Sequence, residues 1–200
     1  MSLALALLAA YLVGSIPMTL IVARIGAGVD LRTVGSGNLG ATNLYRALGW
    51  KFAVPAGLFD IAKGALPTVL LPPRIGTAAW LPLAVGAAAI VGHVFSIFVR
   101  FRGGKGVATA AGVVLGMAPV PLLVSFAIWI VVLKATGYVS LGSILGAVAF
   151  PITAAALGTT NPYVVPVGCL LAAFILFTHR TNIQRLRAGT ENRFGRGREP

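Results

Sequence analysis

Three short polar segments carry most of the residues that can do chemistry in this 200-residue chain. They are residues 35–43 (GSGNLGATN), 103–109 (GGKGVAT) and 179–186 (HRTNIQRL). Glycine, small polar residues and basic side chains in one segment are typical of loops that bind an anion such as phosphate. Each segment interrupts apolar sequence, where an unsatisfied polar group is costly. We therefore expect the function to lie in these segments.

The glycines of the first two segments partly resemble two nucleotide-binding motifs, but neither motif is complete. Gly35, Gly37 and Gly40 fit G-x-G-x-x-G, and Asp60 follows at about the right interval. That motif needs a preceding strand, whereas an apolar helix precedes this one and Asp60 lies inside another apolar run. Residues 104–106 lack the spacing and the hydroxyl residue of a P-loop. The glycines instead allow the backbone to approach an anion closely.

The first polar segment leads into a predicted short helix. Thr42 or Asn43 is expected to cap a helix that runs through Leu48 and ends at Gly49. Arg46 comes one turn after Thr42 and adds a cation to the positive helix terminus. The combination predicts a phosphate cradle, although a tight glycine turn with no ligand explains the loop equally well.

The second segment repeats this arrangement. Arg100 and Arg102 precede two glycines and Lys105, and a helix is expected to begin near Val107. Lys105 would act as a mobile point charge for a phosphate or acyl-phosphate oxygen. Membrane anchoring by basic residues explains Arg100 and Arg102 well, but it does not explain the glycines around Lys105.

The third segment pairs a histidine with an amide. His179 and Asn182 are three residues apart and share a face on a continued helix, with Arg185 one turn further. Histidine suits proton transfer near neutral pH, although a structural role is more common for a single histidine. Asn182 is expected to position a hydroxyl or a phosphate.

Charged residues also occur inside the apolar runs. Asp60 and Lys63 are three residues apart and can pair on one helix face. A functional role and a structural ion pair are about equally consistent with this spacing. His93 precedes the second basic loop by about two turns, where helix packing is the first interpretation and substrate contact the second.

The composition is that of an integral membrane protein with a single domain over residues 1–200, because 58% of the residues are hydrophobic and 10% are charged. The first apolar run is a retained helix rather than a signal peptide, since no basic residue precedes it and Arg24 follows it. Most of the runs reach the length needed to cross a bilayer. They cover residues 3–23, 52–71, 76–99, 107–133, 139–157 and 163–178.

The net charge of +12 is explained by membrane topology rather than by nucleic acid. Basic residues gather in the loops around residues 24–51 and 100–105 and in a polar tail from about residue 187, which places these on the cytoplasmic side and the N-terminus in the periplasm. A cytoplasmic C-terminus then requires about seven helices. We expect the run 107–133 to be two short segments, broken at residues 118–121 by prolines.

Acids and cysteine are scarce. The chain has four acidic residues, too scattered for a carboxylate-held metal or a carboxylate pair, so no metal is expected. Cys169 is the single cysteine and is expected to be a buried, inert thiol.

The three segments, with residues 60–64 and Gly92-His93, resemble the signature motifs of the bacterial membrane glycerol-3-phosphate acyltransferases that use acyl phosphate, the PlsY family. The resemblance spans nearly the whole chain. One departure is Ser96, which stands where the family usually has a proline three residues after the histidine. The resemblance implies a seven-helix, all-α protein of the bacterial cytoplasmic (inner) membrane, with its active site facing the cytoplasm.

The implied reaction transfers a fatty acyl group from acyl phosphate to the sn-1 hydroxyl of glycerol 3-phosphate, giving lysophosphatidic acid and phosphate, with no cofactor. Implied partners are the two substrates, membrane lipids and a peripheral enzyme that produces acyl phosphate. A transporter of an organophosphate anion is the alternative, and a noncatalytic scaffold is a third. The expected catalytic residues are Ser36, Lys105, His179 and Asn182. The expected substrate-binding residues are Gly37, Asn38, Gly40, Thr42, Asn43, Arg46, Lys63, His93, Gly103, Gly104, Gly106 and Arg185.

Overall fold

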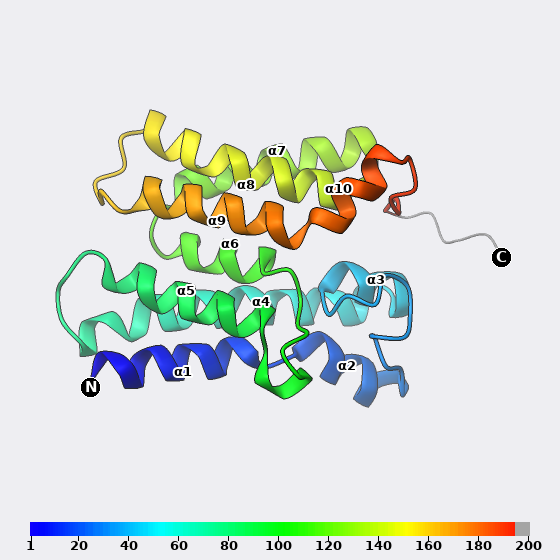
Figure 1. The fold of residues 1–200 in the computed structure, drawn as a ribbon, viewed down its shortest axis with the longest axis horizontal. Coiled ribbons are helices and arrows are strands. Elements are labelled where there is room, and N and C mark those ends of the chain that lie inside the picture. Colours follow the sequence, from blue (N-terminus) through cyan, green and yellow to red (C-terminus); the bar gives the residue numbers. More distant parts are fainter. Residues whose placement is uncertain (195–200) are drawn as a thin grey trace. The chain divides into compact units, whose positions relative to one another are not determined.

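A computed structural model describes residues 1–194, and the regular elements in that range are all helices (Figure 1). The chain forms two compact units, which meet in sequence between Met117 and Ala118. The all-helical class predicted from the sequence is confirmed. The division of the chain into domains stays a prediction.

The first unit contains two closely packed helix pairs. Helix α1 packs against α5, and α4 packs against α6. A methyl group at Gly14 of α1 would lie 2.1 Å from the carbonyl oxygen of Ala89 in α5. Small residues let the backbones approach this closely, as is common between membrane helices. The elements are α1 (Leu3–Ser15), α2 (Met18–Ala27), α3 (Ala41–Leu48), α4 (Trp50–Leu70), η1 (Pro72–Arg74), α5 (Leu81–Val94), η2 (Ile97–Val99) and α6 (Val107–Leu115).

The first apolar run is broken, which the sequence prediction of one continuous helix over residues 3–23 missed. Helix α1 ends at Ser15 and α2 begins at Met18. Pro17 lies at the junction, where it can donate no backbone hydrogen bond. Together the two helices remain long and apolar enough to cross a membrane.

The second unit consists of helices α7 (Pro119–Thr136), α8 (Val139–Ala156), α9 (Val164–Thr178) and α10 (Arg180–Arg187). Helix α8 packs against both α7 and α9. Residues 137–138 form the short turn between α7 and α8, and a longer loop over residues 157–163 joins α8 to α9 (Figure 1). Helix α10 bends away from α9 by 61° at His179. This bend corrects the expectation that His179 and Asn182 lie on one continued helix.

The predicted break at residues 118–121 is confirmed, since α6 ends at Leu115 and α7 begins at Pro119. Proline is well suited to the first helical position because its missing N–H would have no partner there. Helix α6 has nine residues, about 14 Å, and is too short to cross alone. Helix α7 has 18 residues and is long enough, so the prediction that both halves are short is wrong for α7.

Within residues 1–194, five helices are long and apolar enough to cross a membrane, or six if the bent pair α9 and α10 is one span. The number of spans and the orientation of the termini stay predictions. Cys169 lies on the exposed surface of α9, so the expectation of a buried thiol is wrong. Its position on the outer side of an apolar helix was not visible from the run alone.

Candidate active site

The first polar segment is held in shape by one buried amide. Asn43 is 2% exposed, and its Oδ1 accepts a hydrogen bond from the backbone N–H of Ser36 at 2.9 Å. Its Nδ2 donates to the carbonyl oxygens of Leu31 (3.2 Å) and Val34 (3.1 Å). Asn43, predicted to bind substrate, thus fixes the loop that presents Ser36, whose side chain is exposed.

Glycines are required in this loop for two reasons. Gly35 and Gly37 have positive φ angles of 58° and 68°, which favour glycine. A methyl group at Gly35 would also lie 2.3 Å from Oδ1 of Asn43. Gly40 lies against the amide of Asn38, where an added methyl group would be 2.8 Å from Nδ2. The loop is therefore compact, and its backbone is fixed from within.

The short helix after this loop begins earlier than expected. Helix α3 starts at Ala41 with Gly40 as its N-cap and has no side-chain cap. The prediction that Thr42 or Asn43 caps it is therefore wrong, because Asn43 lies inside the first turn and its amide bonds the loop. The predicted end is confirmed, since the helix stops at Leu48 and Gly49 follows with φ +80°. Arg46 lies on α3, half-buried.

A cluster of ion pairs between Asp30 and two arginines, called the charge clamp below, precedes the loop. Asp30 accepts hydrogen bonds from the guanidinium groups of Arg32 (2.6 Å) and Arg24 (2.8 Å). Its Oδ1 also accepts from the backbone N–H of Arg32. The bonds from Arg32, followed by those from Arg24, hold the pKa of the Asp30 carboxyl well below its usual range. Since these groups are exposed, salt weakens the clamp.

The second polar segment is bonded to the end of α5. The backbone N–H of Gly103 donates to the carbonyl oxygen of Val94 (2.9 Å), and that of Gly104 donates to His93 (3.2 Å). Gly106, with φ +84°, is the N-cap of α6, which begins at Val107 as predicted. Lys105 is half-buried between these fixed points. Its backbone position is therefore set by α5 on one side and α6 on the other.

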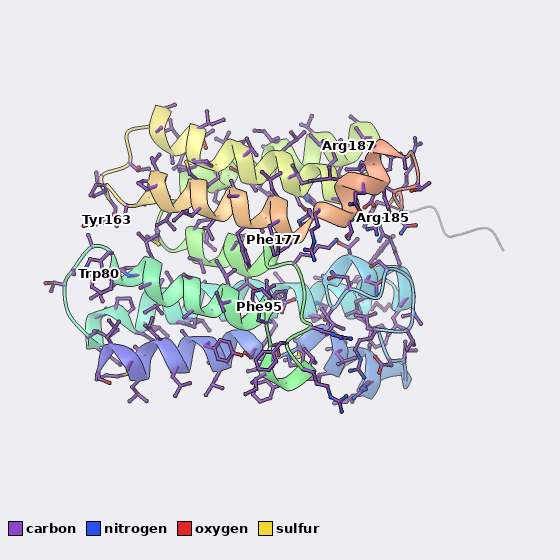
Figure 2. All side chains as sticks on the ribbon, viewed as in Figure 1. Trp80, Phe95, Tyr163, Phe177, Arg185 and Arg187 are labelled. Atoms are coloured by element: carbon purple, nitrogen blue, oxygen red, sulfur yellow. The ribbon has the colours of Figure 1, made fainter. Side chains whose placement is uncertain are left out.

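The turn between α5 and this segment contains an unusual backbone conformation. Arg100 and Phe101 both have positive φ angles, 56° and 60°, and neither is glycine. Phe95 follows α5 (Figure 2), and its carbonyl oxygen accepts a hydrogen bond from the hydroxyl of Tyr11 at 2.8 Å. Residues in sparsely populated conformations persist only where the surroundings hold them.

The first and second segments touch at Gly104. A methyl group there would lie 2.2 Å from Nε2 of His93 and 2.8 Å from the carbonyl oxygen of Leu39, which belongs to the first segment. Gly104 therefore lies between the histidine ring and the other loop. A small cavity beside it is lined in part by Leu39, Lys63, His93 and Gly104. Within the first unit, the structure thus brings both predicted anion loops together.

The third segment lies in the second unit. His179 joins α9 to α10 and is 3% exposed, and its Nδ1 lies 2.9 Å from the carbonyl oxygen of Ile175. With Nδ1 protonated, this contact is a hydrogen bond that fixes the ring and its tautomer. Arg180 places its guanidinium over the ring of Phe177 (4.6 Å to the centroid).

Glu191 organises this segment, although the sequence predicts that it lies in a polar tail with no role in the site. The carboxylate is buried and accepts hydrogen bonds from Asn182 Nδ2 (2.6 Å), Ser140 Oγ (2.8 Å) and Arg185 Nε (2.7 Å). Arg185 and Arg187 are labelled on α10 in Figure 2. An acid among basic residues was the available signal, but its partners in α8 and α10 are set by the fold.

Glu191 is charged because its partners compensate for burial. Burial alone raises the pKa of the Glu191 carboxyl, but hydrogen bonds from Arg185, Asn182 and Ser140 together lower it more. The net pKa lies below its ordinary value. The residues that follow also pack, since the N–H of Phe194 donates to the carbonyl oxygen of Gly137 at 2.7 Å. Residues up to 194 are therefore more than a solvated tail, and residues 195–200 lie outside the described residues.

The predicted site residues divide between the two units. The first unit carries Ser36 to Arg46, Lys63, His93 and residues 103–106, and the second carries His179, Asn182 and Arg185. Lys63 and His93 are buried in α4 and α5. The fold and the loops define the class of the protein, which is a helical membrane protein with two glycine-rich loops suited to binding an anion.

Comparison with known proteins identifies the family. Residues 4–189 match the family model described as glycerol-3-phosphate acyltransferase, and the chain belongs to this family. A glycerol-3-phosphate acyltransferase of Geobacter sulfurreducens is 49% identical over 92% of this chain and 94% of its own length. One from Thermus thermophilus is also 49% identical, over 94% of each.

Solved structures agree with this assignment. The chain is similar to a crystal structure of PlsY, an integral membrane glycerol 3-phosphate acyltransferase, in its glycerol 3-phosphate form. The TM-score is 0.90 with 39% identity, covering 96% of both chains. A lysophosphatidic acid form gives 0.88 with 38% identity, covering 96% of this chain and 95% of the other.

Proposed function

We propose that this protein transfers a fatty acyl group from acyl phosphate to the sn-1 hydroxyl of glycerol 3-phosphate, the first step of phospholipid synthesis. The products are lysophosphatidic acid and inorganic phosphate. The observation that carries this proposal is the contact between two fixed glycine loops at Gly104, with Lys105 directly beside it. Relatives solved in glycerol 3-phosphate and lysophosphatidic acid forms, a substrate and a product of this reaction, support it.

The two reactants are both anions, and the first unit offers groups suited to them. Lys105 and Arg46 hold phosphates, and glycine N–H groups of the loops stabilise the negative charge that develops on the acyl oxygen. Asn182 and Arg185, in the second unit, are kept in place by Glu191. Asn182 contacts the substrate phosphate or hydroxyl in this proposal.

The transfer itself needs no covalent enzyme intermediate, because acyl phosphate has a good leaving group. The sn-1 oxygen forms a bond to the acyl carbon, and the bond from that carbon to the phosphate oxygen breaks. The hydroxyl proton passes to the departing phosphate. Ser36 and His179 orient the hydroxyl or relay this proton. The rate enhancement then comes from positioning the two substrates and from stabilising the charge that develops in the transition state.

An acyl-enzyme on Ser36 is the competing mechanism. Rapid-quench labelling with radioactive acyl phosphate, in the absence of glycerol 3-phosphate, separates the two. Direct transfer predicts no acyl group on the protein at any time point. A labelled peptide containing Ser36, formed as fast as the overall reaction, would rule out direct transfer.

The activity is tested with purified protein in detergent micelles, where no compartment exists. Phosphorus NMR with both substrates should show acyl phosphate converted to inorganic phosphate and glycerol 3-phosphate converted to lysophosphatidic acid. Movement of organophosphate across vesicles without this conversion would indicate a transporter instead. Lys105→Ala should abolish conversion. A noncatalytic scaffold would show no conversion even in the original protein, and Lys105→Ala would then leave membrane lipid synthesis intact.

We place the protein in the bacterial cytoplasmic membrane with its loops facing the cytoplasm, where glycerol 3-phosphate is available. The basic residues of residues 24–51 support this orientation. A membrane-peripheral enzyme that produces acyl phosphate is the expected source of the donor, because an amphiphilic donor remains at the bilayer surface.

A further inference from the structure

A cluster of charged residues inside the first unit has no part in the mechanism described above. Lys63 Nζ of α4 lies 2.7 Å from Asp60 Oδ1, one turn before it, and the two side chains are 1% and 3% exposed. His93 of α5 places Nδ1 3.8 Å from the same oxygen. Charges this deeply buried are costly and need close partners.

The cluster is attached to the break between α1 and α2. Lys63 Nζ donates a hydrogen bond to the carbonyl oxygen of Ile16 at 2.9 Å. The neighbouring carbonyl oxygen, of Ser15, accepts from Ser96 Oγ at 2.5 Å. A break at a proline leaves carbonyl oxygens without helical donors, and here two polar side chains supply the bonds. The ion pair and the broken helix therefore stabilise each other.

The cluster also contacts the second glycine loop. The His93 ring lies directly against Gly104, and the His93 carbonyl oxygen accepts a hydrogen bond from the Gly104 N–H. Asp60, Lys63 and His93 line the same small cavity as Gly103, Gly104 and Leu39. A contiguous chain of contacts thus runs from the helix break through the ion pair and the histidine to the loop that carries Lys105.

We propose that Asp60, Lys63 and His93 are positioning residues that hold the loop 103–106 in the conformation that receives the phosphate of glycerol 3-phosphate. This inference rests on the proposed function, because its readout is acyl transfer. Lys63 does not contact substrate in this proposal: both Asp60 and the Ile16 carbonyl bind its ammonium inside the protein. The cluster acts through His93 on Gly104, and through Gly104 on Lys105.

The test must distinguish a role in positioning the loop from a role in stability alone. It therefore compares the single variants of Asp60 and Lys63 with the double variant. Asp60→Asn and Lys63→Met each leave one buried charge without its partner and should strongly lower the unfolding temperature in detergent. The double variant D60N/K63M has no buried charge left to compensate, so its unfolding temperature should return close to that of the original protein. Both substrates are then varied to obtain kcat and KM.

If the cluster positions the loop, the double variant should remain impaired in acyl transfer even though it is stably folded. The KM for glycerol 3-phosphate should rise, and kcat/KM should fall by about 10- to 100-fold, because the loop is displaced. A double variant that recovers both stability and kcat/KM overturns the proposal, since the pair would then be only a structural lock.

A second variant covers the case in which the double variant does not fold. His93→Gln keeps a polar side chain but not the ring that lies against Gly104, and it removes no full charge. It should raise the KM for glycerol 3-phosphate at an unchanged unfolding temperature, and an unchanged KM contradicts the proposal. Thr68→Val is the control, because it removes a buried hydrogen-bonding group outside the cluster, a hydroxyl of α4 that donates to the Gly64 carbonyl oxygen (2.8 Å).

Failure of the proposed function is recognised separately. In that case the original protein forms no lysophosphatidic acid from the two substrates. Failure of the positioning role appears instead as normal kinetics in His93→Gln, or in a stable double variant, against an active original protein.

Discussion

At the residue scale, amide and carboxylate side chains fix the loops that carry the proposed chemistry. Asn43 bonds the backbone of Ser36 in the first loop and of Leu31 and Val34 just before it. Glu191 accepts hydrogen bonds from Asn182, Arg185 and Ser140. Neither side chain needs to touch a substrate to matter. A buried polar group whose partner is removed loses about 1–3 kcal/mol, so each is sensitive to small changes.

Asn43→Asp tests the first of these roles with almost no change in shape. The carboxylate still accepts from Ser36 N–H, but it cannot donate to the carbonyl oxygens of Leu31 and Val34, which would then face a negative charge. We expect a loss of about 1–3 kcal/mol for each unpaired group and at least a tenfold drop in acyl transfer. Thermal unfolding and the micelle assay measure both. Asn161→Asp keeps its acceptor for Tyr163 N–H and should have little effect.

Glu191→Gln tests the second role through pH. The pKa of Glu191 is below its ordinary value of 4.5 in the folded protein, so its stabilising contribution is present above that pH. The contribution is lost as the pH falls through the lowered pKa. The unfolding temperature of the original protein should therefore fall below about pH 4.5, and less so in Glu191→Gln.

The control for this experiment is Asp30→Asn. Asp30 also has a lowered pKa, but its ion pairs are exposed and should be screened. At about 0.5 M salt, Asp30→Asn should leave the fall of the unfolding temperature at acid pH nearly unchanged. If the unfolding temperature of Glu191→Gln fell at acid pH as much as that of the original protein, charged Glu191 would not be the stabilising group.

At the element scale, glycine contacts determine how α4 and α6 pack. A methyl group at Gly64 would lie 2.2 Å from the carbonyl oxygen of Thr109, and one at Gly112 would lie 1.9 Å from that of Ile61. Both obstacles are backbone, which cannot rotate away. Since α6 begins directly after Gly106, its position also sets that of Lys105.

Gly64→Ala should therefore separate α4 from α6. We expect destabilisation of about 1–3 kcal/mol, the usual range for overpacking, and reduced acyl transfer. Gly76→Ala is the control, because its added methyl would be 3.6 Å from Leu81, an ordinary contact. Equal unfolding temperatures for the two variants would show that the helices adjust without cost.

The elements that proline and glycine mark were predictable, and those that depend on distant partners were not. Pro119 and Gly106 correctly indicated where α7 and α6 begin, because both residues act on the local backbone. The break at Pro17 was missed because the flanking sequence is apolar on both sides. The structure shows what stabilises it there, namely Lys63 and Ser96 from other parts of the first unit.

At the scale of the whole molecule, the chain has the helices of a multi-pass membrane protein and the sequence of a known acyltransferase family. The apolar runs and the three polar segments sufficed to predict both. Glu191 could not be placed in this way, because its partners lie up to 51 residues away in the chain. The roles of the site residues stay predictions.

The orientation of the protein can be tested across one helix. Lys51 lies in the first turn of α4, and Thr77 follows the other end of that helix, just after η1. The distribution of basic residues predicts that Lys51 is cytoplasmic and Thr77 periplasmic. In a Cys169→Ala background, Thr77→Cys should react with an impermeant maleimide in intact cells, and Lys51→Cys only after permeabilisation. The reverse pattern would place the loops on the wrong side for the proposed reaction.

Gly104 has a consequence for how the two loops move. A methyl group added there would collide with the His93 ring on one side and with the Leu39 carbonyl oxygen of the other loop on the second side, so the loops leave no room for a side chain. A shift of either loop by a few tenths of an ångström must therefore be matched by its neighbour. In the proposed function both loops bind an anion, and their contact at Gly104 then couples the two sites. We therefore expect occupancy of one site to change the affinity of the other, by the same factor in both directions.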